Sequence, residues 1–467
     1  MIFSSLEYLI FFIVVLLFMI FVKSNKIKKG FLLVASYYFY AYWDYRFVFL
    51  MFIMSLVNYY FGLKIENSEK QNVKKNWLIT SVVFNLTILG FFKYFNFFIE
   101  SANTMLDNFG VRFPYLEIIL PVGISFITFE VMSYTIDIYR KTNKSPNNFW
   151  DLALLVAFFP HLIAGPILKP KEFFPQLQKE IIIRWSNVEV GIQIFLFGLA
   201  KKVLIADRLA LFVGPVFDSP QIYSSITIWL AVIAYAIQIY CDFSGYSDMA
   251  IGSAKCLGFD IPRNFNMPYV SKSVTEFWRR WHISLSTWLK EYLYISLGGN
   301  RKGKVRQYMN LMIVMLLGGL WHGASWNFVI WGGLHGVALG IHKVYMDYIR
   351  QPNQKESYMY NFFSWLLTFI FICIAWVFFR SKDFTNSLII IQKMFFMNGV
   401  EGINWYATSL FIIIPVIVIA HFIGKKLGDY AYFKLNTFKG LFVLFFVLFG
   451  LLFLTPVNSS PFIYFQF

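Results

Sequence analysis

Long apolar segments recur along the whole chain and are separated by short polar loops. They cover residues 6–22, 31–43, 46–63, 77–99, 117–139, 150–166, 188–213, 226–250, 307–321, 324–345, 360–379, 406–423 and 439–455. A helix needs about 20 apolar residues to cross the hydrocarbon core of a bilayer. The pattern therefore predicts an all-α polytopic membrane protein with roughly 11–13 transmembrane or re-entrant helices.

Several of these segments are too short for a full crossing and contain helix-breaking residues. The stretch from 150 to 176 contains Pro160, Pro166, Pro170 and Pro175. Membranes tolerate broken helices only where protein surrounds them. We therefore expect this stretch to form a re-entrant or half helix within the bundle.

The composition supports this interpretation. Of the 467 residues, 58% are hydrophobic and 14% are charged, whereas a soluble domain has about 45–50% apolar and about 25% charged residues. Soluble globular, disordered and disulfide-scaffold proteins are therefore excluded. The cysteines Cys241, Cys256 and Cys373 have neither CxxC nor metal-like spacing, so we expect buried, reduced thiols.

The charge is unevenly placed along the chain. There are 41 Lys and Arg residues against 25 Asp and Glu, which gives a formal net charge of +16. Nucleic acid is a usual partner of basic proteins, but the sequence has no basic domain to bind it, and we expect no nucleic-acid partner. Ten Lys and Arg residues fall within 255–306, and the positive-inside rule places this block in the cytoplasm.

The same rule orients the rest of the chain. Segment 6–22 precedes a lysine cluster and has no small-residue cleavage site, so we expect a retained first span with its N-terminus outside. Alternation places the tail, about 456–467, outside as well. We interpret residues 1–467 as a single integral-membrane domain. Its cytoplasmic block covers about 251–306 and its candidate catalytic core about 240–345.

Residues 275–293 predict an amphipathic helix within this core. Apolar and aromatic residues recur at positions 277, 281, 285, 288 and 292, which places them on one face of a helix. Arg279 and His282 lie on the other side. A plain membrane-surface helix would also explain the tryptophans and arginines, so the pattern alone leaves both interpretations open.

His322 interrupts an apolar, glycine-rich stretch, GGLWHGASW, at residues 318–326. An ionisable side chain within a membrane segment is costly, and it is a functional-site hypothesis by default. A neutral imidazole can take a proton from a hydroxyl, as acyl transfer from a thioester to an alcohol requires. The alternative is a histidine that is hydrogen-bonded within the bundle and only packs helices together.

Two further histidines follow His322. On one straight helix His335 lies about 220° around from His322, so we do not expect the two to share a site through one helix face. His335 and His342 are seven residues apart and share a face, which raises the question of metal binding. No Asp, Glu or Cys accompanies them at ligand spacing, and we expect no metal site.

Asp242 ends a long apolar segment. A buried carboxylate costs several kcal/mol unless it is paired, so we expect a partner such as Arg or His. A structural ion pair fits this pattern at least as well as a catalytic role. Lys201 and Lys202, with Asp207 and Arg208, are interpreted as positive-inside anchors at the membrane surface.

Six stretches of the chain together resemble one protein family. They are TEFWRRWHISLSTWLKEYLYISLGGNRKG (275–303), LLGGLWHGASWNFVIWGGLHG (316–336), LPVGISFITFEVMSYTIDIYR (120–140), FFPHLIAGPILKP (158–170), YCDFSGYSDMAIG (240–252) and PFIYFQF (461–467). The chain resembles the membrane-bound O-acyltransferase (MBOAT) family, and within it the bacterial AlgI and PatA type, which O-acetylates alginate or peptidoglycan. The resemblance covers nearly the whole sequence.

The resemblance implies a ring of transmembrane helices around a central tunnel, in the cytoplasmic (inner) membrane of a bacterium. It implies acetyl-CoA as the cytoplasmic donor substrate, with no permanently bound cofactor. The implied partner is a periplasmic acetyltransferase with an SGNH-hydrolase-like domain, which completes transfer to a polysaccharide hydroxyl outside. The alternatives are D-alanyl or other acyl transfer from a carrier protein and, in a different class, a polytopic transporter or flippase.

The resemblance also assigns residues. The principal histidine of the family matches His322, and the second matches His282. As a mechanistic hypothesis, His322 acts as general base toward the acceptor hydroxyl and His282 positions the donor or stabilises developing charge, and the order of these roles stays open. Tyr464 in the tail is the candidate acyl relay, against the simpler interpretation of a tyrosine at the membrane interface. The candidates for donor binding or for the tunnel are Trp278, Arg279, Arg280, Trp281, Trp321 and Asp242.

Overall fold

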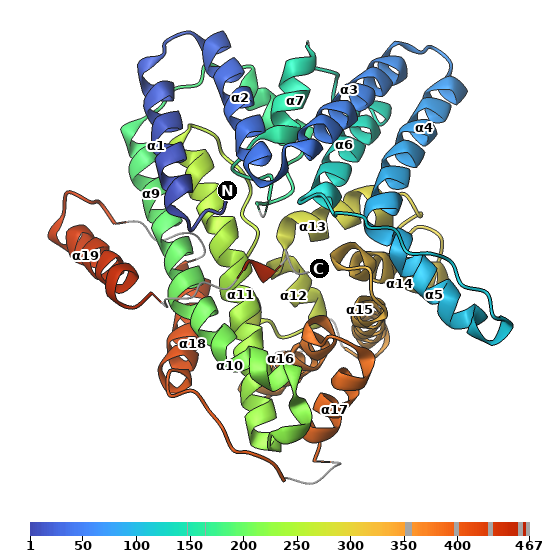
Figure 1. Ribbon diagram of the computed structural model, residues 1–467, viewed down its shortest axis with the longest axis vertical. Coiled ribbons are helices and arrows are strands. Elements are labelled where there is room, and N and C mark those ends of the chain that lie inside the picture. The colour runs from blue at the N-terminus through green and yellow to red at the C-terminus, as the bar shows by residue number, and fades with distance from the viewer. Residues whose placement is uncertain are drawn as a thin grey trace. The chain divides into compact units, whose positions relative to one another are not determined.

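The computed structural model describes residues 1–146, 148–163, 165–350, 357–396, 401–427, 433–455 and 461–463 (Figure 1). Helices dominate these residues, and the only isolated bridge of extended backbone found among them joins Tyr223 and Ile403. The expected all-α fold is therefore confirmed.

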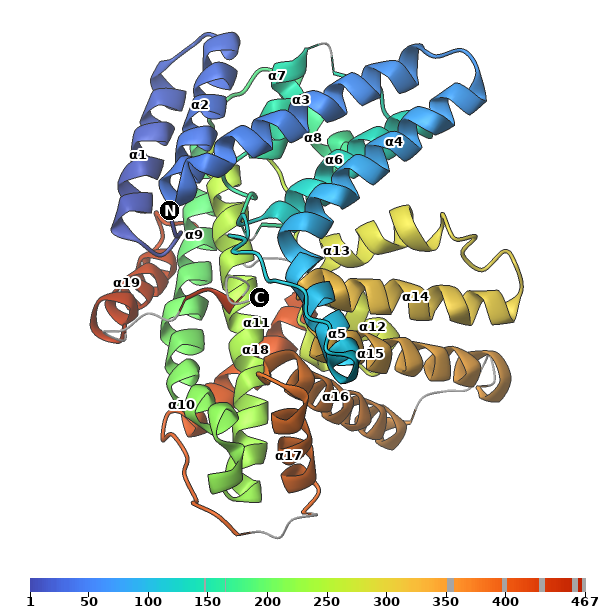
Figure 2. The ribbon, with the colours of Figure 1, turned by 45° about the vertical axis from the view of Figure 1, so that its right-hand side comes forward.

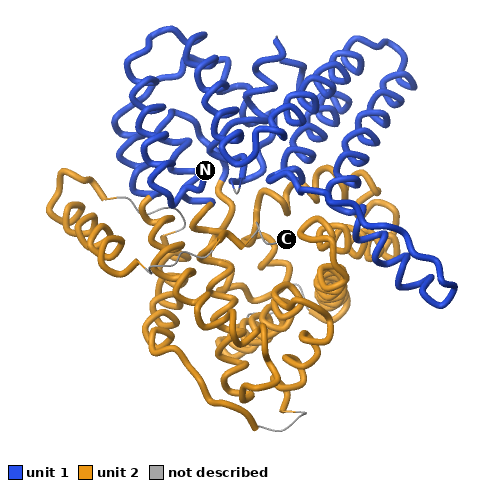
Figure 3. Tube along the Cα trace, viewed as in Figure 1, with its two compact units in different colours: residues 1–195, 247–262 blue, residues 196–246, 263–467 orange. Residues whose placement is uncertain are grey.

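The chain folds into two compact units (Figure 3). The first contains residues 1–195 and 247–262, and the second contains 196–246 and 263–467. Helix α9 (Trp185–Ala200) and the long helix α11 (Ser225–Cys256) each contribute residues to both units.

The helices of the first unit begin near the N-terminus and follow one another closely. They are α1 (Leu6–Phe21), α2 (Asn25–Asp44), α3 (Arg46–Asn67), α4 (Gln71–Leu89), α5 (Phe95–Leu106), α6 (Ile124–Tyr139), α7 (Phe149–Ala157) and α8 (Pro170–Leu177). The helices of the second unit are α10 (Asp207–Asp218), α12 (Val274–Arg280), α13 (Ile283–Trp288), α14 (Lys304–His322), α15 (Trp326–Val344), α16 (Tyr358–Arg380), α17 (Phe384–Met394), α18 (Leu410–Leu427) and α19 (Phe438–Phe453).

Several of these helical segments can cross a membrane. Among the described residues, five are long and apolar enough: Arg46–Asn67, Gln71–Phe109, Ser225–Cys256, Tyr358–Arg380 and Leu410–Leu427. Leu6–Phe21 and Phe438–Phe453 are shorter apolar helices. All of them coincide with apolar segments of the sequence. The expected polytopic membrane protein is confirmed by this set.

The helices do not follow the apolar pattern everywhere. α7 ends at Ala157, and residues 158–163 and 165–169 continue as buried, irregular backbone, which confirms the interrupted helix expected between 150 and 176. Segment 117–139 is helical only from Ile124, because Gly123 precedes the helix with a left-handed φ of 76°. The apolar pattern does not predict α17, which lies between two of its segments.

Helices α14 and α15 run side by side in close contact (Figure 2). A Cβ atom added at Gly319 would overlap the carbonyl oxygen of Phe328, and one added at Gly332 would overlap that of Met315. Backbones approach this closely only where glycine provides no side chain. The contact fixes the short turn between the two helices, and with it His322 at the end of α14.

Replacing Gly332 with leucine should destabilise the protein by about 1–3 kcal/mol, because the new side chain forces α14 and α15 apart. Gly340 on the same helix has open space where its Cβ would lie, so Gly340→Ala should be neutral or stabilise by up to about 1 kcal/mol. Thermal unfolding of both variants in detergent measures the difference. Equal midpoints for the two would contradict the close helix contact.

Candidate active site

The structure brings together the two histidines that the sequence singled out. His322 is the last residue of α14, and His282 lies between α12 and α13. Their ring centroids are 6.3 Å apart, and both side chains are buried. Two ionisable groups therefore share one apolar environment in the second unit.

His282 breaks the helix that the sequence predicts. The expected continuous helix over 275–293 is wrong: α12 ends at Arg280, His282 adopts a left-handed φ of 42°, and α13 begins at Ile283. The predicted apolar face is buried nonetheless, at positions 277, 281, 285, 288 and 292. A non-glycine residue in this conformation costs about 1–2 kcal/mol, and such strain persists only where surrounding contacts enforce it.

Asn264 supplies those contacts. Its Oδ1 accepts hydrogen bonds from the backbone N–H of Ser284 at 3.2 Å and from the Ser284 hydroxyl at 2.9 Å, and lies 3.1 Å from Nδ1 of His282. A backbone N–H can only donate, so this atom of Asn264 is the acceptor oxygen. Nδ1 of His282 therefore carries the proton, and Nε2 carries the lone pair.

This tautomer makes His282 a proton acceptor at Nε2. The residue lies outside the five candidate spans, and burial lowers its pKa to about 3, so the imidazole is neutral at physiological pH. The sequence does not single out Asn264, because no spacing or motif separates it from the other asparagines of the chain. Only the fold places it against His282, 18 residues away.

Aromatic rings enclose His322. The centroids of Trp321, Trp331 and Phe379 lie 5.0, 5.1 and 5.3 Å from its own, all in edge-on arrangements. Trp321 also lies 5.8 Å from His282, so it contacts both histidines. The rings exclude water and lower the local dielectric constant, which strengthens every polar interaction made inside the cluster.

His335 belongs to the same aromatic cluster. Its Nδ1 accepts a hydrogen bond from Nε1 of Trp278 at 3.2 Å. Trp331 lies 4.8 Å from His335 and 5.1 Å from His322. The expected separation of the two histidines assumed one straight helix, but the chain turns between α14 and α15, and Trp331 links them. Among the described residues, no group of His, Cys, Asp and Glu is arranged to hold a metal ion.

The remaining tryptophan candidate lies deeper in the packing. Trp281 is fully buried, with Phe265 and Trp376 each 4.9 Å away and Phe277 stacked at 5.6 Å. These contacts hold α12 in place. Of the tryptophans that the resemblance assigns to the tunnel, Trp321 contacts both candidate catalytic histidines.

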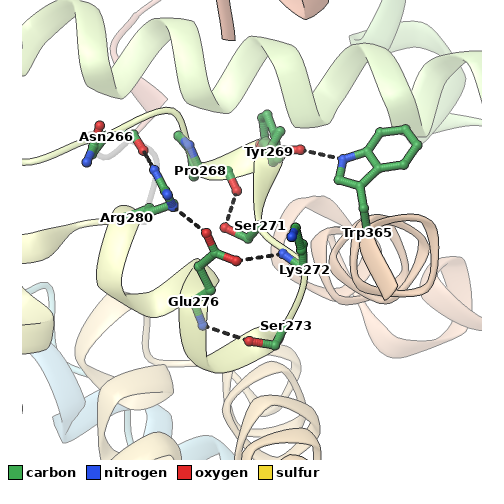
Figure 4. Close-up of polar contacts among 9 residues, drawn as sticks. All are labelled: Asn266, Pro268, Tyr269, Ser271, Lys272, Ser273, Glu276, Arg280 and Trp365. Carbon is green, nitrogen blue, oxygen red and sulfur yellow. Dashed lines mark hydrogen bonds and ion pairs between the residues drawn. The ribbon is translucent and has the colours of Figure 1, made fainter. Parts of the chain in front are cut away.

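A pocket of about 520 Å³ lies on the other side of α12. Its walls include Thr275, Arg279, Arg280, His342, Met346 and Arg350. Arg280 is held in place, because its Nε lies 2.9 Å from Oε1 of Glu276 and its Nη1 donates to the Asn266 carbonyl at 3.0 Å (Figure 4). Arg279 is exposed. Arginine side chains in a pocket suit an anionic ligand, phosphate above all.

The wall of this pocket is rigid. Ser273 caps α12 by accepting the N–H of Glu276, and the other carboxylate oxygen of Glu276 accepts the backbone N–H of Lys272 at 2.9 Å (Figure 4). The indole of Trp365 donates to the Tyr269 carbonyl at 2.8 Å. The arginines therefore project from a short helix that is fixed at its N-terminus.

Asp242 is paired, but with a different residue from those expected. Nζ of Lys202 lies 2.8 Å from Oδ1 of Asp242 and 2.6 Å from Oδ1 of Asp207, and all three side chains are buried. The partner is thus a lysine, where Arg or His was expected. The interpretation of Lys202 and Asp207 as surface anchors is wrong, because their charges are neutralised inside the protein. Tyr464 lies outside the described residues.

The sequence matches known proteins over these same elements. The family described as MBOAT, membrane-bound O-acyltransferase, matches residues 140–382, which include His282 and His322. A probable alginate O-acetylase AlgI of Pseudomonas aeruginosa is 43% identical over 397 residues, 85% of this chain and 75% of that protein.

Two other relatives differ in their acceptors. A peptidoglycan O-acetyltransferase of Helicobacter pylori is 36% identical over 493 aligned residues, 95% of this chain and 92% of its own length. A teichoic acid D-alanyltransferase of Bacillus subtilis is 25% identical over 288 residues, 58% of this chain and 71% of its own. The buried histidine pair, the apolar helices and these matches agree: the chain belongs to the membrane-bound O-acyltransferase family and is an integral-membrane O-acyltransferase.

Proposed function

We propose that this enzyme takes an acetyl group from acetyl-CoA in the cytoplasm and passes it through the membrane for O-acetylation of an extracytoplasmic polysaccharide. Alginate and peptidoglycan are the acceptors named for its relatives. Acetyl transfer is favoured over D-alanyl transfer, because the O-acetylating relatives are more similar and align with more of the chain than the D-alanyltransferase. Because the chain belongs to an acyltransferase family, we favour this function over the alternative of a polytopic transporter or flippase.

The observation that carries the proposal is the buried pair His282 and His322 at 6.3 Å. In the proposed reaction the oxygen of an acceptor hydroxyl attacks the thioester carbonyl carbon, the C–O bond forms and the C–S bond breaks. The hydroxyl proton passes to His322 and from there to the CoA thiolate. Nε2 of His282 carries the lone pair in the tautomer that Asn264 imposes, and in our proposal it accepts a hydrogen bond from the substrate.

The basic pocket supports a cytoplasmic CoA donor. Arg279, Arg280 and Arg350 line it, and CoA carries its negative charge on phosphates. Both arginines of α12 belong to the block 251–306, which the positive-inside rule places in the cytoplasm. The proposed location is therefore the bacterial cytoplasmic membrane, with both termini outside.

The tail supplies the acceptor hydroxyl of this reaction in our proposal. The phenol of Tyr464 attacks the thioester, its proton passes through His322 to the departing CoA thiolate, and an acetyl-tyrosine ester forms. A periplasmic acetyltransferase with an SGNH-like domain then transfers the acetyl group to a polysaccharide hydroxyl, whose proton restores the tyrosine.

His322→Ala should reduce transfer of label from acetyl-CoA to polymer by a factor of about 10²–10⁴, the usual contribution of a general base. His421→Gln is the matched control: His421 is also 3% exposed, but it packs on Tyr240 and Tyr269. The assay uses membranes with the partner present and equal protein abundance. Equal label in His322→Ala and wild type would end the proposal, and label from a D-alanyl carrier alone would favour the D-alanyl alternative.

Arg279→Ala should raise KM for acetyl-CoA about 10- to 150-fold and leave kcat nearly unchanged, because a lost arginine–phosphate contact removes about 1.5–3 kcal/mol of binding. S-acetyl-pantetheine, which lacks the phosphates, should show no such change. Arg112→Ala removes an arginine whose side chain is 77% exposed and serves as control. An identical loss with both donors would show that Arg279 does not bind phosphate.

Tyr464→Phe should abolish acetylation of the polymer, because the ring remains but the acceptor hydroxyl is lost. Acetyl-CoA binding should be unaffected. The measurement compares label on the purified chain with label on the polymer in the same membranes. Polymer acetylation at the wild-type level would exclude the relay and leave Tyr464 as an interfacial aromatic residue.

A further inference from the structure

We propose that Asp242 is a positioning residue for the chain's own C-terminal segment, which it holds beside the histidine cluster. The proposal rests on the proposed function only where it assigns a purpose to this segment, the relay at Tyr464. The docking itself is supported by contacts within the second unit.

The backbone of the tail is bonded directly to Asp242. The amide N–H of Ile463 donates to Oδ2 of Asp242 at 2.8 Å. Asp242 is 221 residues earlier in the chain, on α11, and both groups are buried. The anchor therefore lies one peptide bond before Tyr464.

The side chain of Phe462 in this segment is packed as well. The ring of Phe462 lies 4.1 Å from that of Tyr246 and 6.0 Å from that of Phe243, both on α11. Phe462 is fully buried. Burying a phenylalanine side chain contributes about 1.5–3 kcal/mol, so hydrogen bond and ring together can hold the segment against its loss of conformational entropy.

The charges around Asp242 favour a backbone N–H at this place. Asp207 and Asp242 share the ammonium group of Lys202, so two formal negative charges meet one positive charge in a buried environment. Oδ1 of Asp242 faces Lys202, which leaves Oδ2 in need of a donor. The amide of Ile463 satisfies it without adding a charge, and a hydrogen bond to a charged acceptor is stronger than one between neutral groups.

Two features of the backbone bring Lys202 and Asp242 together. A Cβ atom added at Gly245 would lie 2.7 Å from the carbonyl oxygen of Gly198, so α9 and α11 can approach closely at this level. Directly after α9, residues Lys201–Ala206 form a π-helical turn. Such turns often occur at functional sites, and this one carries Lys202 to Asp242.

The docked tail lies next to the candidate catalytic histidines. The ring of Phe243, one residue after Asp242, packs edge-on against His282 at 4.7 Å. Phe462 contacts the same ring of Phe243. The ring of Phe243 thus contacts both Phe462 and His282, and an acceptor that reaches the thioester has to be held close to these histidines.

The docking is tested by the accessibility of the tail, which requires no activity. In an Ile463→Cys background, the new thiol should react slowly with a bulky maleimide, because Ile463 is 5% exposed; Cys241, Cys256 and Cys373 are buried too. Adding Asp242→Ala should speed the labelling of Cys at position 463 at least tenfold. Asp242→Asn, which keeps an acceptor oxygen, should restore much of the protection.

Asp207→Ala is the matched control, since it removes the other carboxylate that is paired with Lys202 and leaves Asp242 to bind the tail. If both alanine variants label equally fast, the ion pair is structural and the proposal is overturned. Slow labelling in Asp242→Ala overturns it as well. Should Asp242→Ala fail to fold, as judged by size exclusion, Phe462→Ala leaves the charges intact and should also expose the thiol; unchanged labelling in that variant contradicts the docking.

Activity then separates this proposal from the proposed function. Asp242→Ala should lower polymer acetylation at least tenfold at unchanged KM for acetyl-CoA, because the donor site is intact and only the relay is displaced. If Asp242→Ala labels fast but acetylates the polymer normally, Asp242 still docks the tail in the wild type, but this docking is not needed for acetyl transfer. A wild-type enzyme without acetyl transfer would refute the proposed function and leave the labelling result standing.

Discussion

Every ionisable side chain buried in this protein has to find its partner inside the protein, and this constraint fixes how the helices come together. In the first unit Nδ1 of His161 lies 3.2 Å from Oε1 of Glu130. In the second unit Lys202 joins Asp207 and Asp242. Removing one partner of a buried ion pair such as Lys202 and Asp242 costs about 3–5 kcal/mol, so this pair selects one arrangement of its helices. Apolar packing alone would permit many different arrangements of these helices.

The strained backbone at His282 follows from the same rule. A left-handed residue opposes folding by about 1–2 kcal/mol, and a typical hydrogen bond contributes about 0.5–1.5 kcal/mol net. Asn264 makes several such bonds across the break, which is enough to offset the strain. The same bonds hold the imidazole in one tautomer. The break in the helix places its ring 6.3 Å from that of His322.

The sequence predicted the helical class, the apolar spans and the buried face of 275–293, because these depend on hydrophobic periodicity. It did not predict the break at His282, which depends on Asn264, a residue distant in sequence. Lys202 was misread for a related reason: a lysine beside an apolar segment has the same pattern whether it faces lipid headgroups or a buried carboxylate. Trp331 and Phe379, which surround His322, could not be predicted as neighbours of the site. Aromatic residues make up 21% of the chain, so one more aromatic position does not stand out in the sequence.

Helix α12 lies between the histidine cluster and the pocket that we propose for the donor. Successive residues of a helix point about 100° apart. Trp278 is therefore directed to His335 and the aromatic cluster, while Arg279 and Arg280 face the basic pocket. A helix of seven residues, capped by Ser273 and packed through Trp281, has little freedom to move one face without the other. Under the proposed function, the arginines that bind a donor phosphate and the tryptophan that faces the histidine cluster are therefore held by the same rigid element.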